Sequence, residues 1–342
     1  MADDSAFMRR LISDVLTRDG MHVVAEATNG REAIDACKRY EPDFLSLDLA
    51  MPEVDGMEVL RKLRPMRDLK IVVVSSFSEQ GGVRAVDALA EGAFELVPKR
   101  STGGKLQDFL DDLLSKAQAA TCDRTPPASN GALLELPAKA PSAPRKTLSS
   151  VKSHPATKKL VMIASSTGGP RALTEVVRHF PGQLGQGLMI VQHMPAGFTR
   201  SLATRLDSDC PLTIGEAEAG EKLDAGHGWV APGGFHTHIR RKRIELSEDP
   251  PVGGLRPCAD ITITSAVQNY GGEIVLAVLT GMGRDGCKGA KLVKEAGGTV
   301  IAEHGDTTTV NGMPRAITEA GLADAVLPID EIGAAIVEAA GE

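Results

Sequence analysis

Short apolar segments alternate with amphipathic segments along most of this chain. The apolar segments have the length and the Val, Ile and Leu content of buried strands, and the segments between them repeat apolar residues at helical spacing. Strands in the first third are expected at residues 22–27, 44–49, 71–76 and 95–99. Because successive parallel strands are usually joined by a helix, this alternation predicts parallel sheets covered by helices, an α/β fold.

The same alternation returns in the second half of the chain. Strands are expected there at 158–165, 187–194, 273–282 and 299–304, with a β-rich middle that includes a hairpin over 236–248. Residues 119–158 are rich in Pro, Ala, Ser and Lys without sustained periodicity, which is typical of a flexible linker. We therefore expect one domain over 1–118, a linker over 119–158, and a doubly wound parallel-sheet domain over 159–342.

Charge and composition argue against several classes of protein. A formal net charge of -7 and a pI near 5.7 disfavour binding to nucleic acid, and the one dense basic run, 240–243, is expected to be a solvated face of the hairpin. No apolar run approaches the roughly 18 residues of a membrane-spanning helix, and the N-terminus lacks the apolar core of a signal peptide. The five cysteines are widely spaced without a C-x-x-C pair. We expect a cytoplasmic protein that does not insert into a membrane.

Polar side chains follow several strands of the first domain at the point where each strand ends. Asp48 ends one apolar run, Ser75 follows IVVV, and Lys99 follows ELVP. Asp3 and Asp4 form an acidic pair near the start. An isolated Asp at a strand end is more often a turn residue, but parallel strands gather their carboxyl ends at one edge of the sheet. Carboxylates, a hydroxyl and an ammonium group gathered there suit Mg²⁺-dependent phosphoryl transfer.

Residues 3–114 carry DDSAFMRR, LDLAMPEVDG, VVVSS and PK in that order, and resemble the receiver domain of two-component response regulators. The resemblance implies a flavodoxin-like fold with Asp48 as phosphoacceptor, Ser75 as switch hydroxyl and Lys99 as phosphate partner. The Mg²⁺ ligands that it implies are Asp4, Asp48 and the Ala50 carbonyl, with Asp3 in support. A histidine kinase would be the phosphodonor. Leu96 stands where the family usually has an aromatic residue.

The start of the chain departs from this resemblance. Receivers begin with an apolar strand inside the sheet, but only Met1 and Ala2 precede Asp3. The loss of about four buried aliphatic residues forfeits roughly 1.5–3 kcal/mol each. The first strand is therefore expected to be missing. Either the true start lies upstream of Met1, or the receiver is degraded and controls the second domain only loosely. A linker segment such as 131–136 filling the slot is the less favoured alternative.

Three polar residues lie at or just beyond the ends of three apolar strands in the second domain. Ser166 follows LVMIAS, His193 follows MIVQ, and Asp285 follows VLAVLTGMGR. Each alone could be a cap, strand-end or turn residue, but together they suit the nucleophile, base and orienting group of acyl transfer. Ser166 is preferred to Ser165 because it lies in the turn before a helix, where backbone N–H groups point at developing negative charge.

The chain order of these residues argues against an ordinary lipase or esterase. α/β-hydrolases have the order Ser, Asp, His, and Ala164 replaces the first glycine of their nucleophile elbow. The motifs SSTGGPRAL, IVQHMPAGFTRSLATRLD, WVAPGG, LTGMGRDG and NGMPRAI instead resemble the catalytic domain of the chemotaxis protein-glutamate methylesterases, the CheB family. The site that the resemblance implies is Ser166 as nucleophile, His193 as base, Asp285 as third member, the Met282 backbone N–H as oxyanion donor, and Thr167 as a lining residue.

The activity implied is hydrolysis of glutamyl γ-methyl esters on methyl-accepting chemotaxis receptors, with deamidation of receptor glutamines as a second activity. No cofactor is expected for hydrolysis, and Mg²⁺ belongs to the receiver. The resemblance also implies that the unmodified receiver covers the esterase site until a chemotaxis histidine kinase phosphorylates Asp48. The rival hypothesis is a response regulator whose second domain only binds a partner. The complete Ser, His and Asp set favours an enzyme, because a binding domain does not need it.

Overall fold

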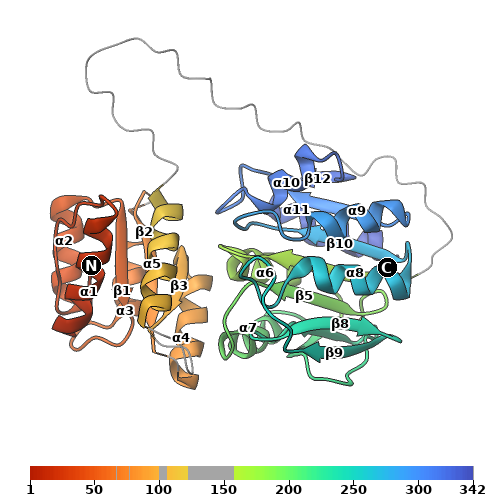
Figure 1. Cartoon of the computed structure of the whole chain (residues 1–342), viewed down its shortest axis with the longest axis horizontal. Coiled ribbons are helices and arrows are strands. Elements are labelled where there is room, and N and C mark those ends of the chain that lie inside the picture. Colours follow the sequence, from red (N-terminus) through yellow and green to blue (C-terminus); the bar gives the residue numbers. More distant parts are fainter. Residues whose placement is uncertain (67, 77, 100–105, 122–157, 342) are drawn as a thin grey trace, which may run out of the picture. The chain divides into compact units, whose positions relative to one another are not determined.

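The chain forms two compact α/β units, Met1–Ser142 and Ala143–Glu342 (Figure 1). The computed structural model describes residues 1–66, 68–76, 78–99, 106–121 and 158–341, so the expected linker, including segment 131–136, lies almost wholly outside the described residues. The elements of the first unit are α1 (Ala6–Arg18), α2 (Gly30–Tyr40), β1 (Phe44–Asp48), α3 (Gly56–Leu63), β2 (Lys70–Ser75), α4 (Glu79–Ala90), β3 (Glu95–Pro98) and α5 (Leu106–Thr121).

The sheet of the first unit is parallel, in the order β1-β2-β3. Leu47, Val72 and Val73 are fully buried at its centre. Helices α1 and α5 pack together, and α2 packs against α3. The strands are almost wholly buried, and their runs are mostly apolar, as is typical of parallel sheets.

Met1–Asp3 takes the place of the first strand of this unit, which was expected to be missing. Ala2 forms parallel bridges to Ala27 and Leu47, and Asp48 N–H donates to the Ala2 carbonyl at 2.9 Å. The chain thus keeps the expected strand order, with Met1–Asp3 inside the sheet. The predicted strand over 22–27 was wrong. Within the described chain, Met1–Asp3 forms hydrogen bonds only with Ala25 and Ala27 of this segment, which is too few to hold it as a strand.

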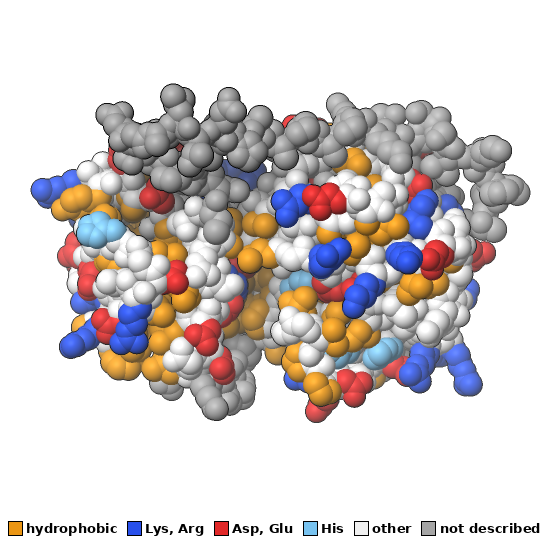
Figure 2. All heavy atoms as spheres, turned by 45° about the horizontal axis from the view of Figure 1, so that its top comes forward, with side chains coloured by type: hydrophobic (Ala, Val, Ile, Leu, Met, Phe, Trp, Pro, Cys, Tyr) orange, Lys and Arg blue, Asp and Glu red, His pale blue; other side chains and the backbone are white. Residues whose placement is uncertain are grey.

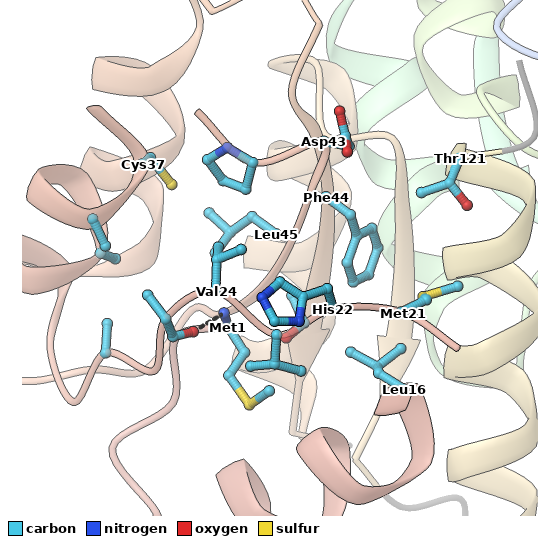
Figure 3. Close-up of a pocket in the computed structure, with 17 residues that line it drawn as sticks. Met1, Leu16, Met21, His22, Val24, Cys37, Asp43, Phe44, Leu45 and Thr121 are labelled. Atoms are coloured by element: carbon cyan, nitrogen blue, oxygen red, sulfur yellow. Dashed lines mark hydrogen bonds between the residues drawn. The ribbon is translucent and has the colours of Figure 1, made fainter. Parts of the chain in front are cut away.

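A cavity of about 450 Å³ lies beside Met1, at the N-terminal end of this short strand. Figure 3 shows Leu16, Val24, Cys37, Phe44 and Leu45 around it. The Met1 ammonium group lies at the cavity and donates to the Ala25 carbonyl at 3.0 Å. Burial lowers the pKa of this amino group, because a charge is costly away from water. The side chains that line this cavity are mostly apolar.

The second unit is built on seven parallel strands in the order β12-β11-β10-β4-β5-β7-β6, with a separate β8-β9 hairpin. Its elements are β4 (Leu160–Ser165), α6 (Gly169–Val177), β5 (Leu188–Gln192), α7 (Phe198–Ser208), β6 (Thr213–Glu216), β7 (His227–Val230), β8 (His236–Arg240), β9 (Arg243–Ser247), α8 (Ala259–Tyr270), β10 (Ile274–Val278), α9 (Cys287–Glu295), β11 (Thr299–Glu303), α10 (Met313–Glu319), β12 (Ala325–Leu327) and α11 (Ile329–Ala340).

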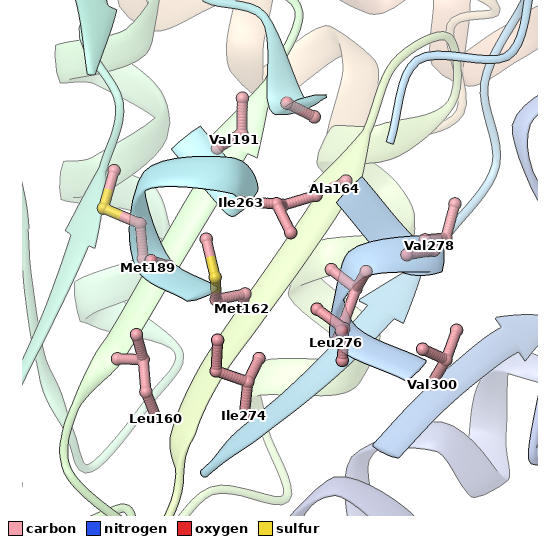
Figure 4. Close-up of a cluster of buried hydrophobic side chains, with 14 of the residues drawn as sticks. Leu160, Met162, Ala164, Met189, Val191, Ile263, Ile274, Leu276, Val278 and Val300 are labelled. Atoms are coloured by element: carbon pink, nitrogen blue, oxygen red, sulfur yellow. The ribbon is translucent and has the colours of Figure 1, made fainter. Parts of the chain in front are cut away.

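The central strand β4 lies between β10 and β5. Met162 pairs in register with Leu276 on one side and Met189 on the other, and these side chains pack with Ile263 of α8 (Figure 4). Burying each such side chain is worth about 1.5–3 kcal/mol, so the three strands are held firmly. The chain winds first to one side of β4 and then to the other, and ligands of such sheets bind where the winding reverses.

Helix α8 was not predicted from the sequence. Its segment ADITITSAVQNY is rich in β-branched residues, which favour strands, so the region was interpreted as β-rich. Packing decides otherwise, because Ile263 and Ala266 are buried and the helix packs against β8 and α9.

The surface of the second unit carries charges of both signs. The hairpin turn places Arg241 and Lys242 at φ 51° and 61°, and the run 240–243 is exposed, as expected for a solvated face. Figure 2 shows basic and acidic side chains interspersed over one face of this unit. None of the helices in the described ranges is both long enough and apolar enough to cross a membrane.

Candidate active site and phosphoacceptor site

Ser166 lies in the tight turn between β4 and α6, at the switch point of the larger sheet. Gly168 has φ 79°, and a Cβ atom there would clash with Thr309. A Cβ atom on Gly169 would clash with the side chain of Gln192. The Gly-Gly pair thus lets the turn pack closely against two neighbouring segments.

The two adjacent serines have different surroundings. Ser165 is fully buried and donates to Gln192 Oε1 at 2.6 Å, whereas Ser166 is partly exposed. Gln192 Nε2 in turn donates to the carbonyls of Ser166 at 2.9 Å and His193 at 3.1 Å. Ser165 therefore supports the turn through Gln192, and Ser166 is the more exposed of the two serines.

The side chains of His193 and Asp285 contact each other directly. His193 follows β5, and Asp285 lies in the loop after β10. His193 Nε2 lies 2.7 Å from Asp285 Oδ2, and the two side chains are only 8% and 7% exposed. The other donors to this carboxylate are the N–H groups of Ala259 at 2.6 Å, Asp260 at 2.9 Å and Gly286 at 3.0 Å, and the Cys258 thiol at 3.2 Å. The side chain of Asp285 thus sits at the N-terminus of α8, which favours a negative charge.

The pKa of Asp285 reflects this set of donors. Burial alone would raise it, but the hydrogen bond and charge of His193 and the backbone N–H groups of α8 outweigh burial and hold the pKa well below its usual range. Burial raises the pKa of the Cys258 thiol to about 12, and the neighbouring Asp285 carboxylate adds to this effect. Asp285 is therefore ionised at neutral pH and fixes His193 through Nε2.

The backbone joins the turn that carries Ser166 to the end of β5, because the His193 N–H donates to the Ser165 carbonyl at 3.0 Å. Within the described ranges, no hydrogen bond joins Ser166 Oγ to His193. Since Nε2 faces Asp285, Nδ1 is the ring nitrogen left for the serine proton. Hydrogen bonds of this kind often tighten only when substrate binds.

The loop after β10 brings Met282 to the same turn. A Cβ atom on Gly281 would lie only 2.7 Å from Ser166 Cβ, so the backbone of the loop touches the nucleophile turn. Met282 is 38% exposed, and its backbone N–H donates to no acceptor within the described chain. A free backbone N–H beside Ser166 could stabilise an oxyanion. Thr167 is buried, and its carbonyl accepts from Thr280 Oγ1 at 2.9 Å.

The first unit gathers its predicted residues at the carboxyl edge of its own sheet. Lys99 Nζ lies 2.7 Å from Asp48 Oδ2 and 3.0 Å from Asp3 Oδ2. Burial raises the pKa of Asp3. Burial would lower the pKa of Lys99, but its hydrogen bonds to Asp48 and Asp3 raise it overall. The ammonium group is therefore held on the two carboxylates.

The carboxylate cluster of this unit has the chemistry of a Mg²⁺ site. Asp3, Asp4 and Asp48 each place a carboxylate oxygen within 4.8 Å of the others, and hard oxygen donors suit this ion. The Ala50 N–H donates to Asp48 Oδ1 at 3.0 Å. The Ser75 hydroxyl donates to the Gly81 carbonyl at 3.0 Å. Leu96 is buried.

Several residues that shape the candidate active site were missed from the sequence. Cys258 and Asp260 reach Asp285 from α8, which was not predicted, and the only signal was the polar cluster RPCAD before that segment. Gln192 is a polar residue that ends an apolar strand beside His193, a signal that could have been used. Thr280 gives no sequence signal of its own.

Both units match known protein families. Residues 161–336 match the family model described as CheB methylesterase, and residues 1–111 match the response regulator receiver domain. A relative from Symbiobacterium thermophilum, named protein-glutamate methylesterase/protein-glutamine glutaminase, is 38% identical over 100% of this chain and 96% of its own length. A relative of the same name from Thermotoga maritima is 35% identical over 99% and 97%.

A solved structure supports the same likeness for the second unit. The crystal structure of the Thermotoga maritima CheB methylesterase catalytic domain is 43% identical, with a TM-score of 0.51, and the match covers 53% of this chain and 98% of that one.

Proposed function

The chain belongs to the CheB methylesterase family, and from this premise we propose that it hydrolyses glutamyl γ-methyl esters on methyl-accepting chemotaxis receptors through Ser166, His193 and Asp285. It is a methylesterase and glutaminase that carries an N-terminal receiver domain. The observation that supports this proposal is that the three residues follow the adjacent strands β4, β5 and β10, with 2.7 Å between His193 Nε2 and Asp285 Oδ2.

The proposed reaction uses each group for one task. Ser166 Oγ attacks the ester carbonyl while His193 Nδ1 takes its proton, and the Met282 N–H stabilises the oxyanion. The proton then passes to the departing methoxide, which leaves as methanol. Water attacks the acyl-enzyme with His193 again as base, and glutamate and free Ser166 are released. Asp285 stays ionised and holds the ring throughout.

A glutamine side chain can follow the same course. Its amide carbonyl passes through the same tetrahedral intermediate, and ammonia leaves in place of methanol. We therefore include deamidation of receptor glutamines in the proposed activity.

The receiver supplies the proposed control. Asp48 accepts a phosphoryl group from a chemotaxis histidine kinase in the cytoplasm, and Lys99 stabilises the phosphoryl oxygens. The Mg²⁺ held by Asp4, Asp48 and Ala50, with Asp3 in support, would neutralise charge on the phosphoryl group. Phosphorylation relieves inhibition of the esterase by the unmodified receiver, with the Ser75 hydroxyl as the switch.

The test is methanol release from membranes that contain methylated receptors. The wild-type chain should release methanol, and Ser166→Ala should not. Ammonia release from receptors with glutamine at the same positions tests the second activity. Equal methanol release by the wild type and Ser166→Ala would overturn the assignment of the nucleophile. If neither protein released methanol, the result would favour a second domain that only binds its partner.

A further inference from the structure

Glu303 is a buried carboxylate for which the proposed reaction has no use. It ends β11 and is 2% exposed. Its Oε2 accepts from the Thr280 N–H at 2.8 Å, and its Oε1 accepts from Thr307 Oγ1 at 3.0 Å. Within the described ranges, no Lys, Arg or His side chain pairs with it. Burying an unpaired carboxylate is costly, so stability alone does not explain an acidic residue here.

Burial raises the pKa of Glu303 to about 7, although the hydrogen bonds from Thr280 and Thr307 oppose the change. The neighbouring strands β10 and β12 present only apolar residues, and the adjacent His304 lies 3.6 Å from Asp306. The hydrogen bonds to Thr280 and Thr307 are therefore the interactions that favour its ionised form.

Thr280 connects this carboxylate to the nucleophile turn. Its carbonyl accepts from Ser166 N–H at 3.0 Å, and its hydroxyl donates to the Thr167 carbonyl at 2.9 Å. The same hydroxyl accepts from Val310 N–H at 2.9 Å. Thr280 is 1% exposed, so water cannot replace these bonds. The carbonyl and hydroxyl oxygens of Thr280 thus hold the turn and a neighbouring loop, and its third polar atom, the backbone nitrogen, is held by Glu303.

The oxyanion loop depends on the same attachment. Gly281 follows Thr280, and its N–H donates to the Val310 carbonyl at 2.9 Å. Gly281 also touches Ser166, and Met282 comes next. A shift of the Thr280 backbone would therefore move the nucleophile and the oxyanion donor together.

We propose that Glu303 is a positioning residue, which acts through Thr280 to hold Ser166 and the Met282 N–H in the geometry that acyl transfer requires. The inference rests on the proposed function of Ser166 and adds a residue that never touches the substrate. A displacement of about 1 Å at a reacting group can cost on the order of 10²-fold in rate.

The experiment compares Glu303→Ala, Glu303→Gln and Thr299→Val in the full chain. Thr299 is a matched control because it is a buried polar residue at the other end of β11. Methanol release gives kcat and KM, and inactivation by a fluorophosphonate reports the reactivity of Ser166. We expect Glu303→Ala to lower kcat by about 10- to 100-fold with KM within about twofold, and to slow inactivation in parallel.

The two control variants sharpen this result. Glu303→Gln keeps an oxygen that accepts from Thr280 N–H, so it should recover most of the lost kcat. Thr299→Val should match the wild type. The folded fraction of each variant is measured by circular dichroism, and kcat is expressed per folded molecule. The inference is overturned if Glu303→Ala keeps the wild-type kcat, or if the kcat of Glu303→Gln is no higher than that of Glu303→Ala.

A second variant covers the case in which Glu303→Ala does not fold. Thr280→Val keeps the side-chain volume but loses the hydroxyl bonds to Thr167 and Val310, and should lower kcat about tenfold. An unchanged kcat would overturn the inference. A fully active Ser166→Ala would overturn the proposed function itself, whereas Ser166 dependence with silent Glu303 and Thr280 variants would overturn only this inference.

Discussion

The two parallel sheets of this chain place their functional groups at the same edge but support them differently. Ser166, His193 and Asp285 follow strands that each have a paired neighbour on both sides. Asp3 follows a strand of three residues, with a cavity of about 450 Å³ at the end away from the site. A strand-end site is only as firmly held as the strand behind it. The esterase site should therefore respond to changes in its chemistry, and the receiver site to changes in its packing.

The largest effect is expected from removing the nucleophile. Ser166→Ala should lower kcat on the order of 10⁶-fold, by analogy with serine hydrolases. Ser165→Ala removes one hydrogen bond to Gln192, worth about 0.5–1.5 kcal/mol, and should cost no more than about tenfold. Methanol release measures both. The reverse ranking would show that the buried serine is the reactive one.

The next effect is expected at Asp285. Asp285→Asn keeps the size of the side chain but removes the charge that fixes His193, and the corresponding change in a serine protease costs about 10⁴-fold. The measurement is kcat at pH 7, with circular dichroism to confirm the fold. Near-full activity would mean that Asp285 only caps α8.

A third prediction concerns packing in the receiver. Four added apolar residues before Met1 should extend the short strand into the cavity and stabilise this unit by about 6 kcal/mol or more, since each buried aliphatic side chain contributes about 1.5–3 kcal/mol. Hydrogen exchange of the β1 amides would show this as slower exchange. Mg²⁺-dependent phosphorylation at Asp48 should rise in parallel.

An extension of four Gly and Ser residues is the matched control, and it should leave exchange unchanged. If the apolar extension gives no more protection or phosphate than this control, then the short strand does not limit the receiver.

The smallest effect concerns the pH dependence of stability in the esterase unit. The pKa of Glu303 is about 7 in the folded chain against 4.5 for an unperturbed Glu. The folded state therefore holds this proton more tightly, so stability falls as pH rises from about 4.5 to 7 and stays lower above it. The total is up to about 3 kcal/mol, and Glu303→Gln should remove it.

Urea unfolding at pH 5 and pH 8, followed through the single tryptophan Trp229 in the second unit, measures this difference. Glu303→Gln should be more stable than the wild type at pH 8 and close to it at pH 5. An equal difference at both pH values would contradict the raised pKa.

The sequence alone was enough to predict both α/β units, most strands and helices, and the residues that gather at each sheet edge. The sequence was enough because the spacing and number of apolar residues indicate which segments form buried strands. The carboxyl ends of parallel strands then meet at one edge of the sheet, whatever the details of side-chain packing. Met282, Thr167 and the Mg²⁺ ligands followed only from the family resemblance, and all the assigned roles stay predictions until the variants are measured.

Tertiary structure decided the rest. Helix α8 forms against its own β-branched composition, because burial of Ile263 outweighs a propensity of a few tenths of a kcal/mol. Its N-terminus then supplies the donors that keep Asp285 ionised. The segment 22–27 does not form a strand, and within the described residues only its Ala25 and Ala27 form hydrogen bonds with Met1–Asp3. Contacts such as Glu303 to Thr280 join residues 23 positions apart, and no local pattern records them, because only folding brings their atoms within hydrogen-bond distance.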